Sequence, residues 1–377
     1  MKILQLGKAF PPVKALGGVE KVIELFYYGL NRVDITCDVL GVNDKYQFVI
    51  DNYCKNGIVY REKLLRRAMS TFLSVHLITR LSRVAHEYDI IHVHHPDPMS
   101  FLALFFVRPK AKLVIHWHSD IIKQKFGYFF FRTLERWVLR QADLILCTSP
   151  KYYSSNDILK PYLEKVNYLP IGFKLDIANR NEDLSNSIEE EKNDRSQIIF
   201  IGRLVYYKGV EYLIKAIPLI KSNSYLCIVG DGSNMDALRK LTIELDVEHR
   251  VLFLGNLNDA DKLAYLKTSD LLVLPSIFRT EAYGIVQVEA MAHGIPVVST
   301  EIDGSGVDWV NMNGKSGITV PICDEKSLAK AIDQIIQNSK LKLKLSKGAL
   351  RRYQTEFTED KMIGNLVNYY YKVMRQS

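Results

Sequence analysis

The stretch LLVLPSIFRTEAYGIVQVEAMAHGIPVVST, residues 271–300, decides the fold class. Its first four residues are an apolar run typical of a buried strand, and residues 296–299 form a second such run. Residues 283–292, between the two runs, have the length and composition of a helix. Two strands joined by a crossover helix lie parallel in one sheet. The stretch therefore predicts an α/β protein.

The same alternation of strand and helix patterns extends on both sides of this stretch. In the second half we expect strands at 197–202, 225–229 and 251–254 and helices at 209–220, 235–245 and 261–266. In the first half we expect strands at 3–6, 89–94, 112–118 and 144–148 and helices at 19–30 and 129–140. Such alternation is typical of doubly wound parallel sheets, which bind ligands beyond the carboxyl ends of their strands.

The length of the chain, 377 residues, is about twice the commonest domain size and predicts two domains. Residues 182–195 are polar and acidic, which makes them the best candidate for a linker. We therefore expect an N-terminal domain at 1–181 and a C-terminal domain at 182–354. Two further helices are expected at 325–337 and 360–373. A two-domain protein of this kind commonly binds its ligand in the cleft between the domains.

The positive charge is concentrated in the first half of the chain. Residues 1–180 hold 26 Lys and Arg against 16 Asp and Glu, whereas residues 181–377 hold 24 against 26. A basic half suggests an anionic partner such as nucleic acid, a phosphorylated substrate or an acidic lipid surface. The basic and aromatic residues 123–140 could lie against anionic lipid, with Arg61, Lys63, Arg66 and Arg67, or could form a packed helix with a charged outer face.

Cysteine usage and hydropathy indicate the compartment. The five cysteines are far apart and form no Cys-x-x-Cys pair, so we expect free thiols in a reducing environment, without disulfides or structural zinc. The first seven residues lack a signal-peptide core, and the longest apolar run, residues 101–107, is too short to cross a bilayer. These features predict a cytoplasmic protein.

Two carboxylates flank the expected helix start within the opening stretch. If the helix begins near Tyr283, the first backbone amides, those of Gly284, Ile285 and Val286, are free to bind a phosphate. Glu281 and Glu289 are separated by about 12 Å along a helix, too far for glycosidase carboxylates, which lie about 5–10 Å apart. We therefore expect each carboxylate to accept hydrogen bonds from hydroxyls at opposite ends of one ligand, a sugar and a ribose, with a diphosphate between them.

Cations that could balance this site follow another predicted strand. The segment GRLVYYKG, residues 202–209, supplies Arg203, a bidentate fork, and Lys208, a point charge. In a transfer reaction these cations would stabilise the negative charge that develops on a departing nucleotide diphosphate. The two segments together predict a binding site for a nucleotide diphosphate sugar.

These motifs resemble those of the retaining glycosyltransferases of family 4, which have the GT-B fold of two Rossmann-like domains facing a cleft. Four motifs occur in the family's order: the glycines Gly17 and Gly18, a histidine after a strand at His118, the Gly-Arg-Leu-x3-Lys-Gly segment and the Glu-x7-Glu pair. The resemblance implies that His118 contacts the transferred sugar and that the two glycines form the opposing loop of the cleft. It also implies that Gly255 and Asn256 lie near the base.

The resemblance further implies roles for the charged residues. Arg203 and Lys208 would bind the donor diphosphate, Glu289 the ribose and Glu281 the transferred sugar, with donor contacts also from Tyr283 and the three amides that follow it. The catalytic candidates are His118, Glu281, Arg203 and Lys208. The C-terminal helix, about residues 355–377, is expected to pack back on the N-terminal, acceptor-side domain.

Some features depart from the family pattern or suggest other chemistry. Trp309 stands near the position where relatives carry an acidic residue. His92, His94, His116 and His118 share strand faces in pairs, but no cysteine or carboxylate cluster accompanies them, so we expect no metal. The segment Asp259-Ala260-Asp261 is expected to cap a helix rather than to bind a metal. A dehydrogenase is disfavoured because the chain has no Gly-x-Gly-x-x-Gly fingerprint.

The sequence thus predicts a metal-independent, retaining transfer of a hexose from a nucleotide diphosphate sugar, with GDP-mannose as our choice of donor. We expect the acceptor to be a glycan or lipid-linked oligosaccharide of a bacterial surface polysaccharide, such as O-antigen or capsule. We expect no other cofactor and no nucleic-acid partner, and a cytoplasmic location with peripheral contact at the inner face of the membrane. A nucleotide-sugar epimerase of the same fold and a non-catalytic nucleotide-sugar binding module remain alternatives.

Overall fold

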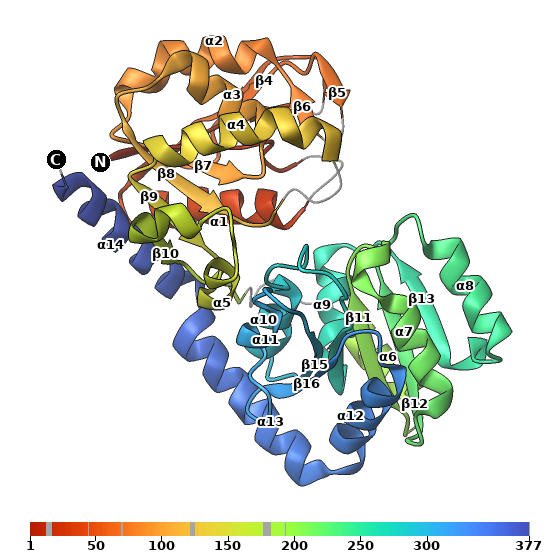
Figure 1. Ribbon diagram of the computed structural model, residues 1–377. Coiled ribbons are helices and arrows are strands. Elements are labelled where there is room, and N and C mark those ends of the chain that lie inside the picture. The colour runs from red at the N-terminus through yellow and green to blue at the C-terminus, as the bar shows by residue number, and fades with distance from the viewer. Residues whose placement is uncertain are drawn as a thin grey trace. The chain divides into compact units, whose positions relative to one another are not determined.

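The computed structural model divides the chain into two compact units. Unit 1 comprises Met1–Ile171 and Glu359–Ser377, and unit 2 comprises Gly172–Thr358. The structure describes residues 1–12, 17–43, 45–68, 71–120, 125–175, 182–192 and 194–376, and for residues 68, 125–130 and 191 it describes the backbone alone. Each unit is built around its own parallel sheet with helices on both sides (Figure 1).

The sheet of unit 1 has eight strands among the described residues, in the order β10-β9-β8-β7-β1-β2-β4-β3. All neighbouring pairs are parallel except β3 with β4. The strands are β1 (Lys2–Leu6), β2 (Thr36–Val42), β3 (Val49–Asp51), β4 (Val59–Glu62), β7 (Ile90–His95), β8 (Lys112–Trp117), β9 (Leu144–Cys147) and β10 (Val166–Tyr168). A separate hairpin is formed by β5 (Arg66–Ala68) and β6 (Thr71–Leu73).

The helices of unit 1 form two groups. The first is α1 (Gly18–Arg32) with α14 (Glu359–Arg375), which pack on each other. The second is α2 (Val75–Val84), α3 (Pro98–Val107) and α4 (Lys125–Gln141), in which α3 packs on both of the others. The sheet runs between these groups in Figure 1, and the short α5 (Pro150–Ser154) follows β9. The last helix of the chain therefore belongs to the unit that contains the first strand.

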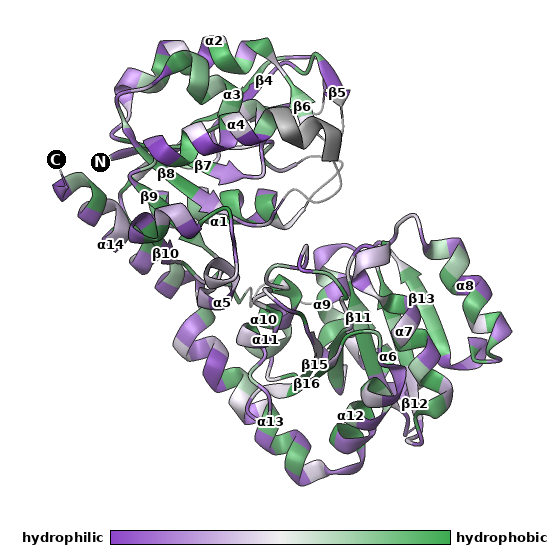
Figure 2. Cartoon of the chain, in the orientation of Figure 1, coloured by the Kyte–Doolittle hydropathy of each residue, from purple (hydrophilic) through white to green (hydrophobic). Residues whose placement is uncertain are grey.

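The sheet of unit 2 has six parallel strands in the order β13-β12-β11-β14-β15-β16. The strands are β11 (Ser196–Ile201), β12 (Ser224–Val229), β13 (Val251–Gly255), β14 (Leu271–Leu274), β15 (Val297–Glu301) and β16 (Gly317–Pro321). All four residues of β14 are buried, because helices cover both faces of the sheet. Figure 2 shows the strands of both units coloured mainly as hydrophobic.

The helices of unit 2 also lie in two groups. One contains α7 (Val210–Ala216), α8 (Met235–Glu244) and α12 (Glu325–Gln337), whose buried faces join the strands in one hydrophobic core. The other contains α6 (Glu182–Glu191), α9 (Asp259–Lys267), α10 (Ile285–Ala292), α11 (Val307–Val310) and α13 (Ser339–Arg352). A π-helical turn, Tyr353–Phe357, continues α13.

The α/β fold with two Rossmann-like units is confirmed, but several elements were not predicted. The missed strands are β2, β3, β4, β5, β6, β10 and β16, and the missed helices are α2, α3, α5, α6, α11 and α13. The sequence of β2 hides its strand character because Asp38 lies in its middle; the buried Asp38 carboxylate accepts hydrogen bonds from the Tyr88 hydroxyl at 2.7 Å and from the Ile58 amide at 2.7 Å. Partners remote in sequence thus allow a charged residue inside a strand.

The interpretation of residues 182–195 as a linker is wrong for most of the segment, since Glu182–Glu191 form the helix α6. Leu184 and Ile188 are four residues apart on one helix face, Ile188 is 4 % exposed, and α6 packs on α9. Lys192 follows the helix, and its ammonium lies 3.6 Å from the Asp270 carboxylate. Two apolar residues at helical spacing were enough to attach an otherwise polar segment to the domain.

Candidate functional site

The predicted donor-binding segments of unit 2 lie at one edge of its sheet. Residues 202–209 follow β11 and residues 275–284 follow β14, and these strands are neighbours. Parallel strands that are neighbours end at the same edge, so the two loops are adjacent. The Ile277 amide donates to the Tyr207 carbonyl at 2.9 Å and ties one loop to the other.

An ion pair joins the two loops at the level of their side chains. The Lys208 ammonium lies 2.5 Å from the Glu281 carboxylate, and these side chains are 12 % and 11 % exposed. The Ser276 hydroxyl donates to the same carboxylate at 3.1 Å. The Ser305 hydroxyl donates to the backbone carbonyl of Glu281 and thereby holds the loop that follows β14. A lysine has three donor protons, so Lys208 can keep this contact and also bind an anionic oxygen.

The start of α10 has the geometry of an anion site. Gly284 precedes the helix with φ +72°, and a Cβ there would come within 2.5 Å of the Leu274 side chain. Glycine is therefore required both by the left-handed backbone and by the space. The amides of Ile285 and Val286 lie in the first turn, where no intrahelical acceptor exists. The Tyr283 ring is buried against Phe357 at a centroid distance of 6.2 Å, so only its backbone faces this turn.

Arg203 lies in the loop after β11 and is exposed. Its guanidinium donates to the Tyr207 hydroxyl at 3.2 Å, the one hydrogen bond it makes to a described residue, which leaves several donors for an anion. Gly209 ends this loop with φ +62°, where a Cβ would meet the Pro275 carbonyl at 2.2 Å. The close approach of the two loops thus depends on Gly209.

Glu289 lies one turn into α10 and pairs with Lys262, which the sequence interpretation missed. The Lys262 ammonium lies 3.3 Å from the Glu289 carboxylate and 3.3 Å from that of Asp259. Burial disfavours the charged ammonium, but Glu289 and Asp259 outweigh this effect and raise the pKa of Lys262. No motif marks Lys262, because it comes from a helix 27 residues earlier in the sequence that packing brings to α10.

The cap of α9 differs in detail from the prediction. Asn258, rather than Asp259 or Asp261, is the N-cap, and its side chain accepts from the Asp261 amide at 2.9 Å. Asp259 and Asp261 occupy the first turn, where carboxylates are stabilised by the helix dipole. Gly255 and Asn256 lie just before this helix at the end of β13; Asn256 is exposed, and the Gly255 position has open space around it.

In unit 1, His118 follows β8 and Gly17 and Gly18 begin α1. The Gly17 amide donates to the Glu20 carboxylate at 3.0 Å, and a Cβ at Gly18 would meet no atom within 4 Å. The His118 ring is 6 % exposed, and its Nε2 lies 2.9 Å from Nδ1 of His94. Burial, with a smaller effect of His95, lowers the pKa of His118 to about 3. His118 is therefore a neutral side chain at pH 7.

The neighbouring histidines form a buried cluster. One nitrogen each of His92, His94 and His116 lies within 4.8 Å of the others, which is wider than the roughly 3.3 Å between nitrogens bound to one zinc ion at about 2.0 Å. Both nitrogens of His94 already take part in hydrogen bonds, to Gln5 and His118. A metal at His94 would therefore have to displace one of these two hydrogen bonds.

Comparisons with known proteins were made for sequence and for structure. Residues 181–352 match the family model described as "Glycosyl transferases group 1", and residues 16–154 match "Glycosyltransferase Family 4". The chain is 30% identical over 370 residues to the O-antigen chain mannosyltransferase C of Escherichia coli, which covers 98% of each chain. The chain belongs to glycosyltransferase family 4. It is thus an enzyme that transfers a sugar from a nucleotide-sugar donor.

A second relative and two solved structures are also similar to this chain. The D-rhamnosyltransferase WbpZ of Pseudomonas aeruginosa is 29% identical over 95% of this chain and 92% of its own. Sucrose-phosphate synthase from Thermosynechococcus elongatus has a TM-score of 0.82 at 20% identity, covering all of both chains. Anabaena HepE in complex with UDP has a TM-score of 0.75 at 21% identity, covering 99% of this chain and 100% of its own. The likeness to these structures shows the GT-B fold.

The departure of this family 4 glycosyltransferase at Trp309 has a structural explanation. The Trp309 ring packs against the Arg352 guanidinium at 5.2 Å and against Phe357 at 5.9 Å. The Arg352 guanidinium also donates to the Trp309 and Val310 carbonyls. Trp309 therefore attaches α11 to the end of α13, because its large aromatic ring can contact both the Arg352 guanidinium and the Phe357 ring.

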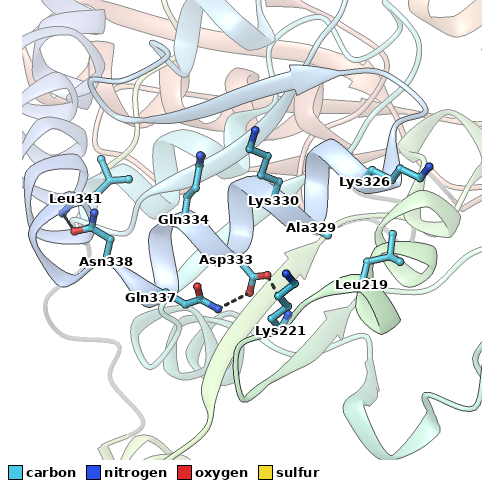
Figure 3. A pocket seen from close by; sticks show the side chains of 10 residues that line it. All are labelled: Leu219, Lys221, Lys326, Ala329, Lys330, Asp333, Gln334, Gln337, Asn338 and Leu341. Carbon is cyan, nitrogen blue, oxygen red and sulfur yellow. Dashed lines mark hydrogen bonds between the residues drawn. The ribbon is translucent and has the colours of Figure 1, made fainter.

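A hollow elsewhere in unit 2 contains none of the predicted site residues. Figure 3 shows Lys221 and Gln337 beside Asp333, which accepts from the backbone amides of Lys221 at 3.0 Å and Ser222 at 2.9 Å; Lys326 and Lys330 also line the hollow. Lys221 precedes β12, so this hollow lies at the amino edge of the sheet, away from the donor-binding loops. In the described ranges, no helix has both the length and the hydropathy needed to cross a membrane.

Proposed function

We propose that this family 4 glycosyltransferase transfers mannose from GDP-mannose to a glycan or lipid-linked acceptor in the synthesis of a surface polysaccharide, O-antigen or capsule. Support comes from the relative named as an O-antigen chain mannosyltransferase, which matches 98% of the chain. The second relative is named as a D-rhamnosyltransferase. D-rhamnose is 6-deoxymannose, so both names refer to sugars of manno configuration.

The contact between Lys208 and Glu281 is the structural observation that best supports this function. In a nucleotide diphosphate sugar, the β-phosphate is bonded through an oxygen atom to the anomeric carbon of the sugar. A cation for the phosphate and a carboxylate for the sugar hydroxyls must therefore lie side by side, as Lys208 and Glu281 do at 2.5 Å. Arg203 and the first amides of α10 add donors for the diphosphate, and Glu289 is placed one turn further on for the ribose.

The proposed reaction retains the anomeric configuration and needs no metal. The bond to the acceptor oxygen forms on the face from which the phosphate leaves, and a phosphate oxygen takes the acceptor's proton. Arg203 and Lys208 stabilise the charge on the departing diphosphate. NMR of the product should show the anomeric configuration of the donor, and EDTA should leave the rate unchanged. An isolated covalent glycosyl-enzyme, or activity that EDTA removes and Mg²⁺ restores, would contradict these two points.

We propose peripheral contact with the inner face of the membrane through the β5–β6 hairpin. Arg66 and Arg67 are exposed there, and Leu65, Leu73 and Val75 are 44%, 37% and 56% exposed. Such a mixture of cations and apolar side chains favours anionic lipid surfaces.

Arg61 and residues 123–140 are also candidates for membrane contact predicted from the sequence. Arg61 does not take part, because it is 6 % exposed and its guanidinium donates to the Phe10 and Pro11 carbonyls. In residues 123–140, Lys123 lies outside the described residues, as do the side chains of 125–130. The later part of α4 is packed through Glu135, Val138 and Leu139 and exposes Arg132, Arg136 and Arg140.

Vesicle sedimentation tests this contact. The protein should bind vesicles containing anionic lipid at low salt, and R66E/R67E should release it, whereas K240E on the exposed face of α8 should not. Binding that is absent, or equal on neutral vesicles, would contradict the membrane proposal while leaving the transferase proposal intact.

A donor screen tests the transferase proposal directly. A ligand at 100 times its dissociation constant stabilises a protein by about 2.7 kcal/mol, so GDP and GDP-mannose should raise Tm more than UDP, ADP and their sugars. Transfer from GDP-mannose to a lipid-linked acceptor should then be detected by mass spectrometry. Conversion of the donor without an acceptor would favour an epimerase, and binding without any turnover would favour a non-catalytic binding module.

A further inference from the structure

A chain of buried hydrogen bonds in unit 1 leads from the last helix to His118. It begins at Tyr370 on α14 and passes through Gln5 in the middle of β1 and His94 on β7. The Gln5 amide nitrogen donates to the Tyr370 hydroxyl at 3.2 Å, and the Gln5 carbonyl oxygen lies 2.8 Å from Nε2 of His94. Nδ1 of His94 lies 2.9 Å from Nε2 of His118. Gln5, His94 and Tyr370 are at most 1% exposed.

The chemistry of the amide gives this chain a direction. The Gln5 carbonyl oxygen can only accept, so Nε2 of His94 must carry a proton. Burial lowers the pKa of His94 well below its ordinary value, so the ring is neutral and holds that one proton. Nδ1 of His94 is then an acceptor, and the proton between the two rings belongs to Nε2 of His118. The ring planes differ by only 6°, which suits an in-plane hydrogen bond.

Tyr370 contacts the Gln5 amide at the other end of these hydrogen bonds. Its hydroxyl accepts from Gln5 and lies 2.6 Å from Nδ1 of His92, to which it can donate its single proton. Were the amide turned over, its nitrogen would face His94, and each proton along the chain would shift to the other nitrogen of its ring. His118 would then carry its proton on Nδ1. The orientation of the Gln5 amide, whose oxygen faces His94, therefore selects one of two proton arrangements at His118, two residues further along these hydrogen bonds.

The arrangement determines what His118 presents to a ligand. The His118 ring is neutral, and His118 is the most exposed of the four residues joined by these hydrogen bonds. Its Nδ1 makes no hydrogen bond in the described part of the protein. With the proton on Nε2, Nδ1 carries a lone pair and can only accept. A hydroxyl group, which can donate, fits this nitrogen; a phosphate or carboxylate oxygen does not.

We propose that Tyr370, Gln5 and His94 are positioning residues that hold His118 in the Nε2–H tautomer, so that its Nδ1 accepts a hydrogen bond from a hydroxyl of the transferred sugar. The ligand assignment rests on the proposed function, in which His118 contacts the sugar. The tautomer does not rest on it, because the tautomer follows from the protein's own hydrogen bonds. The C-terminal helix is thereby linked to His118, a residue of the same unit.

The tautomer is measured first, without any substrate. Long-range proton–nitrogen NMR spectra of protein labelled with ¹⁵N-histidine distinguish protonated from unprotonated ring nitrogens, and His118→Gln identifies the signals of His118. Wild-type protein should show a protonated Nε2 and an unprotonated Nδ1 at pH 7. In Gln5→Met, which keeps the side-chain length and removes the acceptor, and in Tyr370→Phe, the signals should move toward a mixture of both tautomers.

A matched control is available in unit 2. Gln197 lies on the first strand of that sheet, is fully buried, accepts from the Tyr225 hydroxyl at 2.7 Å and donates to the Tyr265 carbonyl at 2.8 Å. Gln197→Met therefore removes a comparable set of buried hydrogen bonds far from His118 in the hydrogen-bond network. Its His118 signals should remain those of the wild type. The Gln197→Met control thus distinguishes a general loss of stability, which Gln5→Met and Gln197→Met should share, from a change of the His118 tautomer, which only Gln5→Met should cause.

Kinetics then tests the role of the tautomer. In Gln5→Met, kcat/KM for the donor sugar should fall about tenfold, the value of one hydrogen bond, whereas the Kd of the nucleotide diphosphate alone should not change. In a His118→Ala background, Gln5→Met should cause no further loss. If the shorter amide of Gln5→Asn restores the wild-type tautomer of His118 in the NMR spectrum, kcat/KM should recover as well; if it does not restore the tautomer, kcat/KM should stay low.

The outcomes separate the two proposals. A protonated Nδ1 in the wild-type protein, or an unchanged tautomer in Gln5→Met, would overturn the positioning role whatever the activity. An altered tautomer with unchanged kcat/KM would overturn the contact with the sugar hydroxyl. Failure of the wild-type enzyme to use any donor would count against the proposed function, and the NMR result would still decide whether Gln5 and Tyr370 set the tautomer.

Discussion

The two Rossmann-like units stabilise the polar groups at the carboxyl edges of their sheets in opposite ways. Unit 1 holds neutral histidines, His92, His94 and His116, that are at most 1 % exposed and whose rings contact one another. Unit 2 holds Lys208 and Glu281 as an ion pair that is 11–12 % exposed. Complete burial favours neutral forms, whereas an adjacent opposite charge allows ions to persist. The same fold thus carries buried neutral side chains at the sheet edge of one unit and an ion pair at the sheet edge of the other.

The largest effect is expected where the charge balance of unit 2 is broken. Lys208→Ala should lower kcat by about 10²–10³, the cost of removing one group that stabilises developing negative charge. Turnover with saturating donor is the measurement. Lys240→Ala, which removes a lysine that is 78% exposed on α8, is the control and should keep the wild-type rate. Equal rates in both variants would mean that Lys208 does not stabilise the departing diphosphate.

The two carboxylates of unit 2 should separate in their effects. Glu289→Ala should weaken donor binding by about 10- to 100-fold with little change in kcat, since it removes hydrogen bonds to the ribose made throughout the reaction. Glu281→Ala should chiefly lower kcat, because its partners lie at the reacting end of the donor. Calorimetric titration of the donor and steady-state kinetics give both quantities. The same pattern in both variants would contradict the separate assignments to ribose and sugar.

Acid should weaken unit 1 more than unit 2. Burial lowers the pKa of His92, His94 and His116 well below the ordinary value, and that of His118 to about 3. Below about pH 6.5 the unfolded chain binds protons that the folded chain excludes, so each such histidine removes about 1.4 kcal/mol of stability per pH unit. Stability is unaffected by these groups above pH 6.5 and is lost progressively as the pH falls toward 3.

Urea unfolding at pH 7, 6 and 5 measures this loss. Trp117 and Trp137 lie in unit 1 and Trp309 in unit 2, so fluorescence of Trp309→Phe reports unit 1 alone. His116→Phe should reduce the dependence on pH by about one proton, because the buried ring then has no titrating group. If the free energy of unfolding changed with pH in His116→Phe as it does in the wild type, His116 would have to be protonated in the folded protein.

The smallest effect is expected at Lys262. Lys262→Met should weaken donor binding about two- to fivefold, the range of a partly exposed ion pair, because Glu289 then adds an uncompensated negative charge near the diphosphate. Lys262→Arg should restore most of the affinity. The difference between the two variants should shrink at high salt, as expected for a screened charge. Tighter donor binding in Lys262→Met would mean that Lys262 competes with the ribose for Glu289.

The prediction from sequence succeeded where local patterns were long or repeated. The apolar runs at β1, β8, β11, β12 and β14 and the amphipathic pattern of α12 and α14 gave the fold class. It failed where remote partners decide, as at β2, whose Asp38 is held by Tyr88, and at α6, whose Ile188 is buried by α9. A local pattern cannot show which distant side chain satisfies a polar residue or covers an apolar one.

The Glu281 motif shows the same division within the site. The sequence alone determined the spacing of the two glutamates, the glycine at the start of α10 and the cations after β11, because these depend on the order of residues around a strand end. Only the tertiary structure decided that Lys208 contacts Glu281, that Lys262 contacts Glu289, and that Gln5 and Tyr370 lead to His118. These contacts join residues from different strands and helices, and their partners are fixed by packing of the whole domain.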